Sequence, residues 1–125
     1  MKNGLISDSQ ITASSLASNQ RIGYQGAKNA RLDSVATDSM AGAWVALIGD
    51  ASPWLQIKFT MLMSIAGIVL QGRKGNDQWV TKYEVQSSSN NGVTWEYVKD
   101  ESNEVMVSRP ILIVHSQQNC DTIDQ

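Results

Sequence analysis

Alternating apolar and polar residues in the middle of the chain predict a half-buried β-strand. In the stretch WLQIKF, the apolar residues Leu55, Ile57 and Phe59 fall on one face and polar residues fall on the other. Residues 65–70 follow as a short, mostly apolar run rich in β-branched side chains, closed by Gly72. This composition and length predict a second strand, buried on both faces.

A hairpin is predicted next. Residues 80–86 and 93–98 are rich in β-forming side chains, and an Asn-Gly dipeptide stands in the polar segment between them. Asn-Gly tolerates the positive φ angles that tight turns require. Two further candidate strands, residues 105–107 and 111–114, lie on either side of a proline.

Several short strands separated by turn signals predict an all-β domain, an antiparallel sandwich or barrel. The first half of the chain differs, because residues 12–53 contain few apolar runs and many small polar residues. We expect long loops there around one or two short strands. Loops of that length in a compact domain usually carry function.

Composition limits the classes of protein. The chain has 125 residues, enough for one domain, with 42% hydrophobic and 18% charged residues, as in ordinary soluble domains. Its net charge of −2 provides no broad basic field for nucleic acid. The apolar runs are too short to cross a bilayer, and Met1 leads into polar residues rather than the apolar core of a secretory signal. The single cysteine, Cys120, is a free thiol or half of a bond whose partner lies elsewhere.

Catalytic and metal-binding patterns are weak, so we predict that the chain is not an enzyme. The one histidine, His115, follows an apolar run. The sequence contains no G-x-S-x-G motif, which would mark a nucleophilic serine for a histidine to activate. One His and one Cys do not make a zinc site. The run Gly72–Gly75 lacks the spacing of a phosphate-binding loop. Four loop carboxylates lack EF-hand spacing and are interpreted as solvated: Asp33, Asp38, Asp50 and Asp77.

Seven short motifs occur in a specific order along the chain. They are ISDSQITASS (6–15), ARLD (30–33), AW (43–44), WLQI (54–57), QGR (71–73), WVTKY (79–83) and Ser88-x-x-x-Gly92-x-x-Trp95. Together they resemble the discoidin domain, also called the coagulation factor 5/8 type C domain, over residues 1–107. The resemblance implies a galactose-binding-like fold, an antiparallel jelly-roll barrel with ligand-binding loops at one end. It also implies a non-catalytic extracellular domain that binds cell-surface glycans, phospholipid head groups, collagen or other proteins.

The chain departs from the family pattern at its C-terminal side. After Val107 the family's closing motifs have no counterpart, so we expect a barrel that lacks its last strands. Residues 108–125 are interpreted as a divergent tail in which residues 111–114 form a candidate extra strand. The family's N-terminal cysteine is also absent, which leaves Cys120 without a family partner.

The resemblance places ligand contacts on three loops. The first is residues 16–28, with Asn19, Gln20, Arg21 and Tyr24 near its tip. Membrane-binding relatives present large apolar side chains where Gln20 and Arg21 stand here. Burying an arginine in hydrocarbon costs about 2.5–3.5 kcal/mol, so deep membrane insertion is disfavoured and contact with a glycan, protein or head group suits better.

The second loop is residues 36–46 and the third is residues 73–79. The third supplies four candidate contact residues, Arg73, Lys74, Asp77 and Trp79. Each has a structural alternative: Arg21 as a solvated charge, Arg73 and Lys74 as a polar strand end, Trp79 as a tryptophan that caps the barrel. Trp44, Trp54 and Trp95 are expected in the core.

No cofactor is predicted, although some glycan-binding relatives hold a structural calcium ion. Asp33 is the weak candidate ligand, and a solvated Asp33 is the preferred interpretation because its usual helpers belong to the closing segment. Three functions remain open. The first is an extracellular or ectodomain adhesion module for a cell-surface glycan or protein. The second is a phosphatidylserine-binding module in peripheral contact with a membrane, and the third is a carbohydrate-binding module detached from a larger enzyme.

Overall fold

A computed structural model describes residues 5–17, 26–99, 104–105, 107–108 and 112–117. The regular elements are short and mostly extended. They are the 3₁₀ helices η1 (Asp8–Gln10) and η2 (Ala27–Asn29) and the strands β1 (Ile11–Ala13), β2 (Leu55–Leu62), β3 (Tyr83–Ser87), β4 (Glu96–Tyr97), β5 (Val107–Ser108) and β6 (Leu112–Gln117). This confirms the predicted all-β class.

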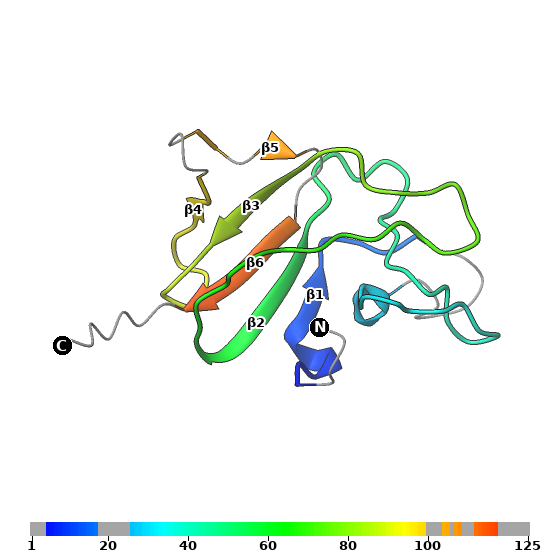
Figure 1. The fold of residues 1–125 in the computed structure, drawn as a ribbon, viewed down its shortest axis with the longest axis horizontal. Coiled ribbons are helices and arrows are strands. Elements are labelled where there is room, and N and C mark those ends of the chain that lie inside the picture. Colours follow the sequence, from blue (N-terminus) through cyan, green and yellow to red (C-terminus); the bar gives the residue numbers. More distant parts are fainter. Residues whose placement is uncertain (1–4, 18–25, 100–103, 106, 109–111, 118–125) are drawn as a thin grey trace.

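The strands form one sheet in the order β1-β2-β6-β3-β4, with β5 paired to β3 (Figure 1). The β1–β2, β3–β4 and β3–β5 pairs are antiparallel. Strand β6 lies between β2 and β3 and runs parallel to both. The sheet therefore has antiparallel edges around a central strand that comes from the C-terminal part of the chain.

Strand β2 carries the alternation that the sequence predicts. Leu55 and Ile57 are buried, whereas Lys58 between Ile57 and the half-buried Phe59 is exposed. Ile11 of β1 lies opposite Ile57 and is buried as well. Among the described residues the buried apolar set is Ile11, Ala41, Leu55, Ile57 and Val85. Fully burying a Leu, Ile or Val side chain contributes about 1.5–3 kcal/mol, so this small core holds β1, β2 and β3 together.

The predicted second strand at residues 65–70 is wrong. These residues form no regular element, and Val69 is 74% exposed. In the described part of the chain they make no backbone hydrogen bond. The physical reason is competition for partners, because β6 occupies the position between β2 and β3. The segment instead crosses one face of the sheet on its way to the next loop (Figure 1).

The predicted hairpin forms, with shorter strands than expected. Residues 86 and 87 pair with 97 and 96, and Val98 N–H donates to the Val85 carbonyl at 2.9 Å. The Ser88 Oγ accepts hydrogen bonds from the Gly92 N–H at 2.9 Å and the Asn90 N–H at 3.4 Å. Gly92 has a φ of 82°. The Ser-x-x-x-Gly spacing of the motif is thus explained by the Ser88 hydroxyl, which binds the N–H of Gly92, the glycine that adopts a positive φ in the turn.

The segment between β1 and β2 is mostly irregular, as predicted. Its described part contains η2 and one isolated bridge between Thr37 and Met40. Trp44 and Trp54 belong to this segment and are half-buried, as is Trp95 beyond it, so the tryptophans predicted for the core lie at its margin. Cys120 lies outside the described residues.

Candidate ligand-binding site

The third predicted loop is closed by its own hydrogen bonds. Arg73 N–H donates to the Gln78 carbonyl at 2.9 Å, and Asn76 N–H donates to the Arg73 carbonyl at 3.2 Å. Gly75 has a φ of 78°, which a glycine adopts without steric cost. A third bond joins the two side chains, from Arg73 Nη1 to Gln78 Oε1 at 2.7 Å. The loop is therefore a defined turn rather than an open connection.

This turn presents a lysine, an aspartate and a tryptophan to solvent. Lys74 and Asp77 are exposed. Trp79 is 65% exposed, so it is not a core residue and most of its side chain is available for contact. Arg73 behaves differently, because it is half-buried and its guanidinium turns back onto Gln78. Arg73 therefore braces the turn, while Lys74, Asp77 and Trp79 form its outer surface.

The second loop projects to the same side of the molecule as the third. Figure 1 shows the cyan loop around residues 34–42 and the light-green loop around residues 72–79 pointing away from the labelled C-terminus. Thr37 and Met40 exchange two backbone hydrogen bonds, of 2.8 and 3.3 Å. Gly42 packs against the backbone of Ala36, where a β-carbon would lie only 2.5 Å from the Ala36 nitrogen. Two compact loops thus share one rim.

The first predicted loop lies largely outside the described residues. This holds for its four candidate contact residues, Asn19, Gln20, Arg21 and Tyr24. At the described start of the loop, Ala17 N–H donates to the Val45 carbonyl at 2.7 Å. The base of the first loop is therefore tied to the chain that leaves the second loop.

A polar cluster that sequence reasoning missed fastens these loop bases. The hydroxyls of Ser15 and Ser14 donate to Asp50 Oδ2 at 2.5 and 2.7 Å. The Ser14 hydroxyl accepts from the Trp54 N–H at 3.0 Å, and the Trp44 indole donates to the Ser15 carbonyl at 2.8 Å. We call these five residues the Asp50 cluster. Hydrogen bonds from Ser15 and then Ser14 lower the pKa of Asp50 below its ordinary value of 3.8.

The candidate calcium ligand Asp33 stands in a different setting. It has a φ of 61°, and its N–H donates to Gln71 Oε1 at 2.7 Å. Among the described residues no group of three or more His, Cys, Asp or Glu side chains could hold a metal ion. A calcium ion at Asp33 is therefore not part of the function proposed below.

An apolar turn next to the cluster also escaped sequence reasoning. Ile48 is 96% exposed, and Gly49 beside it has a φ of 94°. Asp50 N–H closes the turn by donating to the Leu47 carbonyl at 3.0 Å. A pair of apolar residues followed by Gly-Asp is the local signal that predicts such a turn.

Short strands in one sheet, a small apolar core and self-closed loops on one side define the class of protein, an all-β domain. The chain belongs to the F5/8 type C domain family, whose sequence model matches residues 10–115. The resemblance drawn from the seven motifs is confirmed. The family assignment agrees with the prediction that the chain is not an enzyme. The match extends past residue 107, and the division of the chain at that residue stays a prediction.

Curated relatives agree with the family. Retinoschisin from Mus musculus is 34% identical over 101 residues, which cover 81% of this chain and 44% of that protein. Lactadherin from Rattus norvegicus is 31% identical, over 82% of this chain and 24% of that protein. The human EGF-like repeat and discoidin I-like domain-containing protein 3 is 35% identical, over 87% of this chain and 23% of that protein. The chain thus spans less than half the length of these relatives.

A search of solved structures found no significant match. In the part of the chain that the structure describes, helices long and apolar enough for a membrane span are not found.

Proposed function

We propose that this domain is an extracellular adhesion module that binds a cell-surface glycan or protein through its rim of loops. The observation that carries the proposal is the exposed indole of Trp79 beside a turn that is closed by four hydrogen bonds. A rigid turn loses little conformational entropy on binding, so its contacts are converted efficiently into affinity. Exposed tryptophans supply large contact areas and are enriched among residues that dominate binding.

The charges on the turn favour a polar partner of mixed character. Lys74 and Asp77 are both exposed, and they carry opposite signs. An acidic side chain beside the lysine weakens attraction to a densely anionic surface such as a phosphatidylserine membrane. Glycans and proteins offer both donors and acceptors, which suits this pair. The first loop adds Arg21 and Tyr24 as proposed contacts, on sequence grounds alone.

The test compares binding to cells and to a glycan array by the folded chain and two variants. Trp79→Ala removes the exposed indole and should weaken binding by about 30-fold, the loss expected for a dominant contact of 2 kcal/mol. Tyr97→Ala is the matched control, because Tyr97 is an exposed aromatic residue on β4, away from the rim loops. It should bind as the unmodified chain does.

Liposome flotation separates the alternatives. Binding to phosphatidylserine vesicles that rises at low salt, without glycan or protein binding, would replace the proposal with a phospholipid-targeting function. A folded chain that binds neither glycan array, cells nor vesicles would overturn the role of the rim. Equal losses in the Trp79 and Tyr97 variants would remove Trp79 from the site.

A further inference from the structure

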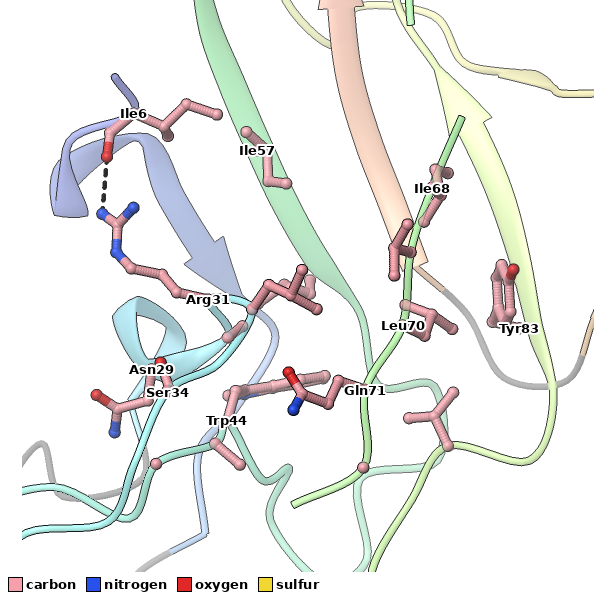
Figure 2. A pocket seen from close by; sticks show the side chains of 18 of the residues that line it. Ile6, Asn29, Arg31, Ser34, Trp44, Ile57, Ile68, Leu70, Gln71 and Tyr83 are labelled. Atoms are coloured by element: carbon pink, nitrogen blue, oxygen red, sulfur yellow. Dashed lines mark hydrogen bonds between the residues drawn. The ribbon is translucent and has the colours of Figure 1, made fainter. Parts of the chain in front are cut away.

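A cavity of about 460 Å³ lies between the sheet and the segment of residues 65–72 (Figure 2). Residues 29–34 and 42–44 close its other side. The cavity lies under the segment that fails to join the sheet, so its existence follows from the missing strand pairing described above. Its volume falls within the range of about 300–1,000 Å³ that is typical of small-molecule sites.

The lining of the cavity is mainly apolar. Ile57 and Phe59 contribute from β2, and Ile68 and Leu70 contribute from the opposite segment. Trp44 adds an aromatic face (Figure 2). The cavity is open to solvent beside the exposed Val69, and its apolar surface favours apolar guests because their contact removes apolar area from water. The lining therefore indicates a ligand whose body is hydrocarbon or aromatic.

Charge selects further among apolar ligands. Arg31 is the one charged side chain among the described residues that line the cavity. Its guanidinium turns toward η1, where Nη2 donates to the Ile6 carbonyl at 2.7 Å (Figure 2) and to Asp8 Oδ1 at 2.6 Å. An ionised ligand would lose hydration without meeting an uncompensated opposite charge. The cavity thus favours a neutral molecule.

Two donors remain for such a molecule. Gln71 Oε1 accepts from the Asp33 N–H at 2.7 Å, which orients the amide and directs its Nε2 donor elsewhere. Figure 2 shows the Gln71 side chain pointing toward Trp44. Tyr83 also belongs to the lining, and its hydroxyl is a second side-chain donor. Within the described residues, neither Gln71 Nε2 nor the Tyr83 hydroxyl has a protein hydrogen-bond partner.

We propose that this cavity binds a neutral, largely apolar small molecule that carries one hydrogen-bond acceptor, such as a carbonyl oxygen. Trp44 and Ile68 enclose its body, and Tyr83 or Gln71 donates to its acceptor. Entry occurs past residues 65–70, because this segment makes no backbone hydrogen bond in the described part of the chain and can move aside at little cost. The cavity shares Gly42, Ala43 and Trp44 with the base of the second loop, but Lys74, Asp77 and Trp79 of the proposed contact surface do not line it.

The test titrates the full chain with Nile red, a neutral aromatic dye that carries one ring carbonyl and becomes fluorescent in apolar surroundings. We expect saturable binding of one dye per chain with a blue-shifted emission. Ile68→Trp fills the cavity and should weaken binding at least tenfold. Ile48→Trp makes the same substitution at an exposed turn outside the cavity and should change binding less than twofold.

A second variant keeps the proposal testable if Ile68→Trp does not fold, as judged by circular dichroism. Tyr83→Phe retains the ring, removes the hydroxyl donor and should weaken dye binding about threefold to tenfold, the worth of one hydrogen bond. Binding that never saturates, or that is equal in the Ile68, Ile48 and Tyr83 variants, would show adsorption to exposed apolar surface and overturn the proposal.

Discussion

Replacing Ser88 with alanine tests the explanation of the Ser-x-x-x-Gly motif. Ser88 is only 3% exposed, and its hydroxyl joins three groups of the β3–β4 turn. It accepts from the Gly92 and Asn90 N–H groups and donates to Asn90 Oδ1 at 2.9 Å. Alanine fills nearly the same space but makes none of these bonds. The substitution therefore measures the contribution of the hydrogen bonds with little change in packing.

The expected loss follows from the burial of the turn. Each hydrogen bond of this type contributes about 0.5–1.5 kcal/mol net, and a buried donor left unsatisfied costs about 1–3 kcal/mol. The bond from Asn90 N–H is long, at 3.4 Å, and contributes least. We therefore expect Ser88→Ala to lower the free energy of unfolding by about 1–3 kcal/mol. For a chain of 125 residues this corresponds to a fall in Tm of about 4–11 °C.

The assay is thermal and urea unfolding followed by circular dichroism. Ser89→Ala is the matched control, because Ser89 is the exposed neighbour of Ser88 and should lose less than about 0.5 kcal/mol. Equal stabilities of the two variants would refute the reasoning, since the motif serine would then contribute no more than a surface serine. A loss in Ser88→Ala that Ser88→Thr largely avoids would confirm that the hydroxyl is responsible.

Three other predictions concern the loops and the core. Gly42→Ala should lower the free energy of unfolding, measured by urea titration, by about 1–3 kcal/mol, because Gly42 has a φ of 68° and a β-carbon there would meet backbone atoms. Gly67→Ala is the control and should be neutral or slightly stabilising, because a β-carbon at Gly67 meets nothing within 4 Å. Ile57→Ala should cost about 2–5 kcal/mol because Ile57 is 6% exposed, whereas Ile48→Ala should change stability by less than about 0.5 kcal/mol; similar urea midpoints for the two would contradict the described core. The pKa of Asp50 is lowered in the folded state, so its contribution to stability is present above the unfolded pKa and is lost as the pH falls through the folded pKa. Unfolding midpoints measured from pH 6 to pH 2 should therefore fall less steeply for Asp50→Asn than for the unmodified chain, and parallel curves would exclude this contribution.

Strand β2 and the hairpin turn could be predicted from the sequence, because interactions between residues close together in the chain determine both. Strand β2 was predicted because the period of Leu55, Ile57 and Phe59 is contained in its own residues. The hairpin turn was predicted because Asn91 and Gly92 are adjacent and both adopt positive φ. Composition and turn chemistry are sufficient at this range.

Pairing between distant residues was beyond such signals. Residues 65–70 have the composition of a strand, but whether they form one depends on which segment takes the place beside β2. That segment is β6, about fifty residues further along the chain. The Asp50 cluster is similar, because Ser14 and Ser15 contact Asp50 across sequence separations of 36 and 35. Nothing local distinguishes Asp50 from the other loop carboxylates.

The candidate site was predicted in part. The turn at residues 73–79 was placed correctly on a loop, and Trp79 is exposed there, while its role as a ligand contact stays a prediction. Arg73 was expected to face a ligand equally with Lys74, but its bond to Gln78 Oε1 turns it inward. A bond between side chains five residues apart depends on the turn that forms between them, so residue types alone did not reveal it.

The Asp50 cluster has a consequence for how this domain can change. Its hydrogen bonds join the described bases of the first and second loops through a carboxylate and two hydroxyls, and residues 36–42 of the second loop take no part in those bonds. Substitutions, insertions and randomised libraries at the loop tips should consequently leave the hydrogen bonds of the Asp50 cluster intact. A domain built in this way can acquire new targets by mutation without first gaining spare stability, which also recommends it as a scaffold for directed evolution.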